Sequence, residues 1–120
     1  MWISVFSEYT KRYSEIIRDL PDIASNPNMS AFNKSSKQGI DKIMGLMRAY
    51  FDLCSEEYYL YRTGRIDSKT WSLWEKGLVY TVRLPTFVDA WKSIKREGYE
   101  KAFVDYIDRI IRNYDKDRIK

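Results

Sequence analysis

Two adjacent carboxylates, Glu56 and Glu57, stand out as side chains whose chemistry could serve a site. Neighbouring positions on a helix point roughly 100° apart, so these two cannot form one site by themselves. Metal sites held by carboxylates on helical bundles ordinarily add histidines at Glu-x-x-His spacing, and the chain has no histidine. We therefore expect no metal ion. One glutamate should face solvent, and the other should pair with an arginine or accept a hydrogen bond from a Tyr or Trp.

The single thiol, Cys54, excludes an internal disulfide and any site built from several cysteines. It lies on an apolar helical stripe, and no Lys or Arg lies one helical turn away to lower its pKa. This position is typical of a small buried hydrophobe in a reducing, cytoplasmic compartment. Because nucleophilic catalysis needs a neighbouring base and the chain has no glycine-rich phosphate loop, we predict no catalytic residues, no cofactor and no enzymatic activity.

Positive charge gathers in the final third of the chain, although the net charge of the whole is only +4. Asp and Glu residues alternate with these basic residues, as they do on ordinary solvated helix surfaces. A phosphate-binding surface would show a cleaner basic stripe. A nucleic-acid-binding accessory protein is therefore the alternative function, and its candidate contacts are Lys92, Lys95, Arg96, Arg109 and Arg112.

The longest uninterrupted helical pattern covers residues 37–63, without proline. One apolar stripe includes Met47, Tyr50 and Cys54, and a second runs beside it through Leu53. A helix that is apolar over so much of its circumference needs neighbours on more than one side. The pattern predicts an all-α fold, a single bundle of four to five helices around a long central helix at about 37–63.

Helix-breaking and capping residues divide the rest of the chain, which at 120 residues fits one domain, 1–120. They are Pro21, Gly64, Asp67, Pro85 and Gly98. Residues 2–20 form a predicted amphipathic helix with the inward stripe Phe6, Tyr9, Tyr13, Ile16 and Leu20. The composition of residues 21–39 predicts a loop with one helical turn after Ser30. We expect Ile23, Met29 and Phe32 to attach this loop to the core. Gly77, on the third helix, should let a neighbouring element approach closely.

Aromatic residues are unusually abundant, with ten Tyr and four Trp. The run from Tyr58 to Tyr61 surrounds the central helix, so at least one of its rings should be exposed. Exposed apolar clusters commonly mark contacts, and the predicted function is a non-catalytic protein-interaction or regulatory domain that binds itself or another protein. The candidate interface residues are Trp2, Tyr58, Tyr59, Tyr61 and Tyr80. The other interpretation is that these rings fill a thin core.

Four groups of residues, spread over most of the chain, share a resemblance. They are Glu8–Ile16 with Leu20 and Pro21; Tyr50–Leu60; Gly64, Ile66, Asp67, Trp71, Trp74 and Gly77; and Pro85, Phe87, Ala90 and Trp91. Together they resemble an uncharacterised family of small helical bacterial proteins. The resemblance implies the helical fold and no functional site. Many such proteins have a membrane helix ahead of the region matching residues 3–20, so we expect a cytoplasmic protein, at the inner face of a membrane if a native N-terminal helix is missing from this chain.

Overall fold

A computed structural model describes the backbone of residues 2–33 and 35–119 and the side chains of residues 6–33 and 35–113. Within these ranges the chain forms helices and no strand, which confirms the predicted all-α bundle. The elements are α1 (Trp2–Asp19), η1 (Asp22–Ser25), η2 (Ala31–Asn33), α2 (Lys37–Arg62), α3 (Ser68–Val82), α4 (Pro85–Ile94) and α5 (Lys101–Ile119). None of the helices in the described part combines the length and apolar character that a membrane span requires.

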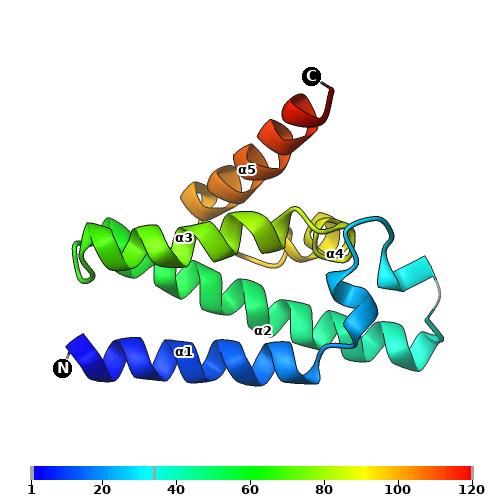
Figure 1. Ribbon diagram of the computed structural model, residues 1–120, viewed down its shortest axis with the longest axis horizontal. Coiled ribbons are helices and arrows are strands. Elements are labelled where there is room, and N and C mark those ends of the chain that lie inside the picture. Colours follow the sequence, from blue (N-terminus) through cyan, green and yellow to red (C-terminus); the bar gives the residue numbers. More distant parts are fainter. Residues whose placement is uncertain (1, 34, 120) are drawn as a thin grey trace.

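Helix α2 is the predicted central helix. Its first turn is capped by Ser36, whose hydroxyl accepts a hydrogen bond from the Gly39 N–H at 3.2 Å. Helices α1, α3 and α4 all pack against it, and Figure 1 shows α1 and α3 on either side of α2. Buried side chains accordingly occur around much of its circumference, including Met47, Phe51 and Leu53.

The turn from α2 into α3 is built as predicted, from a left-handed glycine and a capping aspartate. Gly64 has a φ of 72°, a left-handed conformation that side chains with a Cβ rarely adopt. Asp67 caps α3 by accepting a hydrogen bond from the Thr70 N–H at 2.6 Å. Ile66 and Trp71 are both buried on either side of this cap. The short connection returns α3 alongside α2 (Figure 1).

The connection between α1 and α2 is tied to α4 through small residues. Ala24 and Ala31 are fully buried, and the Ala31 N–H donates a hydrogen bond to Thr86 Oγ1 of α4 at 2.8 Å. The helical turn predicted after Ser30 is confirmed as η2. All three predicted anchors are partly buried, and two of them, Ile23 and Phe32, pack against the core, whereas Met29 does not. Alanine takes the closest positions because its small side chain lets the connection approach α4.

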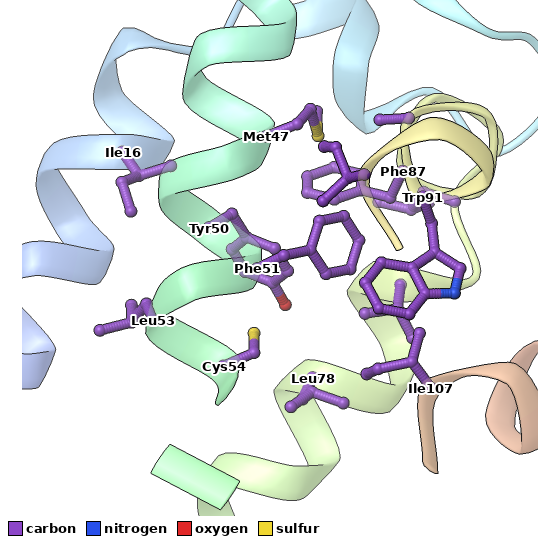
Figure 2. Packing of buried hydrophobic residues seen from close by; sticks show 14 of the residues in the cluster. Ile16, Met47, Tyr50, Phe51, Leu53, Cys54, Leu78, Phe87, Trp91 and Ile107 are labelled. Carbon is purple, nitrogen blue, oxygen red and sulfur yellow. The ribbon is translucent and has the colours of Figure 1, made fainter. Parts of the chain in front are cut away.

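Aromatic rings fill the space between α2 and α4. Figure 2 shows Tyr50 and Phe51 of α2 gathered with Phe87 and Trp91 of α4. The ring centroids of Tyr50 and Phe87 are 5.1 Å apart, and those of Phe51 and Trp91 are 4.8 Å apart. Such contacts combine large apolar burial with favourable ring geometry. This cluster is the centre of the core.

Helix α5 packs against α3 and closes the core over Trp91 of α4. Phe103 and Ile107 are almost completely buried, and the indole N–H of Trp91 donates a hydrogen bond to Asp108 Oδ1 at 2.9 Å. Gly98, with a φ of 100°, makes the turn into this helix. The later turns of α5 run away from the other helices (Figure 1).

Candidate functional site

A pocket of about 210 Å³ opens between α1 and α3, and α2 forms its floor. Its walls are mainly aromatic and aliphatic, with one carboxylate among them. The lining residues are Tyr9, Thr10 and Tyr13 of α1, Tyr50, Cys54 and Glu57 of α2, and Leu73, Trp74, Gly77 and Leu78 of α3. Concave apolar sites with a few polar groups are the usual form of a binding site. We call this pocket, together with the exposed apolar side chains of Phe6, Leu73 and Tyr80 beside it, the α1–α3 groove.

Part of the predicted inward stripe of α1 is more exposed than the sequence predicts, on the side of α1 that borders the groove. Ile16 and Leu20 are buried as predicted, but Phe6 is 36 % exposed and Tyr13 is 40 % exposed. Phe6 stacks against Trp74 of α3, with 5.9 Å between ring centroids. The prediction that these two rings lie in the core is wrong because α1 packs mainly on α2, which leaves the edge facing α3 open.

The α3 side presents large apolar side chains on either side of a notch. Leu73 and Tyr80 are each 65 % exposed, and Gly77 lies between them at helical spacing. A Cβ added at Gly77 would meet nothing within 4 Å. The prediction that Gly77 accommodates a close neighbour is therefore wrong for the described residues. Its missing side chain instead leaves space in the groove.

Glu56 has the partners that the sequence predicts for one of the two glutamates. The two terminal guanidinium nitrogens of Arg12 donate to its carboxylate, at 2.7 and 3.0 Å, and the Tyr9 hydroxyl donates at 3.2 Å. Hydrogen bonding to Arg12 lowers the pKa of Glu56, because these bonds favour its charged form. This carboxylate joins α1 to α2 and lies outside the pocket.

Glu57 lies in the pocket, so the prediction that the second glutamate faces solvent is wrong. Among the described residues, none donates a hydrogen bond to its carboxylate or forms an ion pair with it. Burial raises the pKa of Glu57 to about 7, an effect that the Arg12 charge opposes and the Glu56 charge reinforces. The rotation between adjacent helical positions turns Glu57 away from Arg12 and towards α3. A carboxylate in a mainly apolar pocket, without an ion pair or hydrogen bond to any side chain that the structure describes, is the main chemical feature of this site.

Cys54 is buried beside Tyr50 at the floor of the pocket (Figure 2). Burial raises the pKa of its thiol well above the ordinary value. We expect iodoacetamide at pH 8 to alkylate Cys54 about tenfold or more slowly in the folded protein than in denaturant, because thiolate and access are both scarce. Mass spectrometry of timed samples measures the two rates. Equal alkylation rates in the folded and the denatured protein would contradict the prediction that the Cys54 thiol is unreactive.

The predicted aromatic interface is not gathered into one patch. Tyr58 stacks on Tyr106 and Tyr61 stacks on Trp71, although Tyr61 and Tyr59 stay partly exposed, as predicted for at least one of these rings. Tyr80 is nine residues beyond Trp71, about 13 Å further along α3. The side chain of Trp2 is outside the described residues. Of the predicted interface residues, Tyr61 shares the α2 face of Cys54 and Glu57, and Tyr80 shares the α3 face of Leu73 and Gly77.

The residues of the nucleic-acid alternative lie on α4, the turn that follows it, and α5. Lys92 is 3.6 Å from Asp89 and Lys95 is 3.4 Å from Asp108. Of the five candidate nucleic-acid contacts, four are exposed, namely Lys92, Arg96, Arg109 and Arg112. Neighbouring carboxylates thus offset part of this positive charge. The nucleic-acid alternative stays a prediction.

Sequence reasoning missed the groove, although one signal for it exists. Leu73, Gly77 and Tyr80 share the face of α3 that turns away from its buried stripe, which is where an extra apolar surface would appear. The partners of this face on α1 can be identified only once the helices are placed. Comparison with protein-family models, with curated proteins and with solved structures finds no match for this chain in any of the three.

Proposed function

We propose that this protein is a non-catalytic interaction domain that holds an amphipathic helix of a partner protein in the α1–α3 groove. The observation that carries the proposal is the pair Leu73 and Tyr80, each 65 % exposed, on either side of the Gly77 notch. Exposed apolar patches of this kind commonly mark contacts. Helices dock into such grooves through apolar side chains spaced three, four and seven residues apart.

Charge supports a heterologous helix as the occupant. The pocket beneath the rim contains one carboxylate, Glu57, without a cationic partner among the described residues. An occupant with an apolar face and a positive charge would complement both features. A second copy would have to place one of its own basic residues there. The cytoplasmic setting expected from the sequence is part of this proposal, and the unpaired Cys54 supports it.

Filling the notch tests the proposal. A display library of amphipathic helical peptides of about sixteen residues is selected against the whole chain, and affinities of recovered peptides are measured by fluorescence anisotropy. Gly77→Leu should weaken their binding about tenfold or more, because the new side chain occupies the space that a docked helix needs. Gly45→Leu is the matched control. Gly45 is also helical, exposed and free of neighbours within 4 Å, but it is outside the pocket lining.

Three results would overturn the proposal. The first is that no helical peptide is recovered. The second is that recovered peptides bind the Gly77→Leu and Gly45→Leu variants equally well. The third is a dimer in sedimentation velocity that Gly77→Leu dissociates and Gly45→Leu does not, because a second copy would then occupy the groove.

A further inference from the structure

We propose that Glu57 receives the ammonium group of a lysine side chain on the docked helix, which enters the pocket between α1 and α3. This inference rests on the proposed function and specifies the chemistry of the partner. It follows from the presence of one carboxylate in a pocket whose walls are mainly aromatic and aliphatic. A lysine matches that arrangement, since its four-carbon stem packs on apolar surface while its charge is concentrated at the tip.

The pocket walls suit such a side chain. Tyr9 and Tyr13 of α1 line one side and Trp74 of α3 lines the other. Arg12 already lies over the Tyr9 ring, 5.1 Å from its centroid, and Phe6 stacks on Trp74, so these rings offer apolar surface to the stem of the ligand. A carboxylate that is partly removed from water gains more from a cation than an exposed one does. The charge of the ligand is therefore assigned to Glu57.

The other titratable groups discussed around Glu57 are either paired elsewhere or uncharged, so they do not compete with it for a cation. From α1, Arg12 is engaged by Glu56, and Tyr13 is a neutral phenol whose pKa burial raises. On α2, burial raises the pKa of Cys54 well above its ordinary value. Helix α3 lines the pocket with residues that do not titrate, namely Leu73, Trp74, Gly77 and Leu78. Glu57 is thus the one carboxylate among the lining residues.

Binding should depend on pH because Glu57 must be ionised to pair with the ammonium. The pKa of this carboxyl is raised to about 7, whereas a lysine stays charged well above that pH. A site with such a pKa is about one tenth ionised at pH 6 and mostly ionised at pH 8. We expect affinity for a cationic probe to rise about tenfold over that interval. Affinity for a neutral probe should stay unchanged.

A matched pair of small probes tests the site without a partner helix. The probes are 4-phenylbutylamine and 4-phenylbutanol, which share an apolar body and differ in charge. In titrations of the whole chain at pH 8, followed by NMR at the Trp74 indole, the amine should bind about tenfold more tightly than the alcohol. Glu57→Gln should abolish this difference, and the control Glu97→Gln, at a carboxylate that pairs with Arg48 away from the pocket lining, should keep it. Equal binding of the two probes, or an amine preference that survives Glu57→Gln, would overturn the inference.

Peptides from the selection separate this inference from the proposed function. In each recovered peptide, lysine is replaced one position at a time by norleucine, which keeps the stem and removes the charge. One replacement should weaken binding to the wild-type protein about tenfold and have little effect on binding to Glu57→Gln. Peptides that bind in the groove without such a lysine would overturn the inference and leave the proposed function standing. A free amine that binds more tightly than every peptide would overturn the partner helix as the source of the cation.

Discussion

Replacing Glu57 with glutamine should raise the free energy of unfolding at pH 8 by about 2–3 kcal/mol. The pKa of Glu57 is raised from 4.5 to about 7 in the folded state, so between these pH values the folded protein holds a proton that the unfolded chain has released. Its contribution to stability is complete below pH 4.5 and is lost as the pH rises to about 7. A shift of this size corresponds to roughly 3 kcal/mol, which contact with water in the pocket reduces. Glutamine stays neutral and avoids this loss.

Urea unfolding at pH 4 and pH 8 measures the effect. At pH 4 the Glu57→Gln variant and the wild type should have similar stability, because Glu57 is protonated in both states. Glu56→Gln is the control with the opposite sign. The pKa of Glu56 is lowered by Arg12, so this substitution should cost up to about 1 kcal/mol at pH 8 and less at pH 4. A Glu57→Gln variant that is less stable than wild type at pH 8 would contradict the buried, unpaired carboxylate.

Phe51→Ala should cost about 3–5 kcal/mol of stability, enough to unfold much of the protein if its total stability is ordinary. Phe51 has no exposed surface and contacts both Tyr50 and Trp91 through its ring. Removing the ring opens a cavity between α2 and α4 that neighbouring aromatic side chains can fill only in part. Thermal unfolding followed by circular dichroism gives the loss directly.

Tyr80→Ala is the control for Phe51→Ala, because it also removes an aromatic ring from a helix. Tyr80 is 65 % exposed, so its loss should change stability by no more than about 0.5 kcal/mol. Equal losses in the two variants would show that the core is misplaced. The same Tyr80→Ala protein should bind helical peptides more weakly, since Tyr80 borders the groove.

The parts of the fold that depend on local chemistry were predictable from the sequence. The left-handed Gly64, the capping side chain of Asp67 and the start of α4 at Pro85 each act within one or two turns of the chain. The central helix was predictable because its apolar residues follow helical spacing over most of its length. These features need no knowledge of what lies beside them.

The candidate site was not predictable in the same way. Helical spacing shows that Phe6 and Tyr13 share a face with Ile16, but not that the edge of this face towards α3 stays open. It likewise shows that Glu56 and Glu57 point in different directions, but not which one meets Arg12 and which one enters a pocket. Burial of these side chains depends on where α3 lies relative to α1, which is a property of the assembled bundle.

The packing of α1, chiefly against α2, has a consequence for local unfolding. A helix attached along one side can separate from the rest at a lower free energy than the interior helices, so its backbone amides should exchange with deuterium earlier than those of α2. A ligand that spans the groove would contact α1 and α3 together and oppose this separation. Slower deuterium uptake in α1, without change in the centre of α2, would then be the signature of an occupied groove.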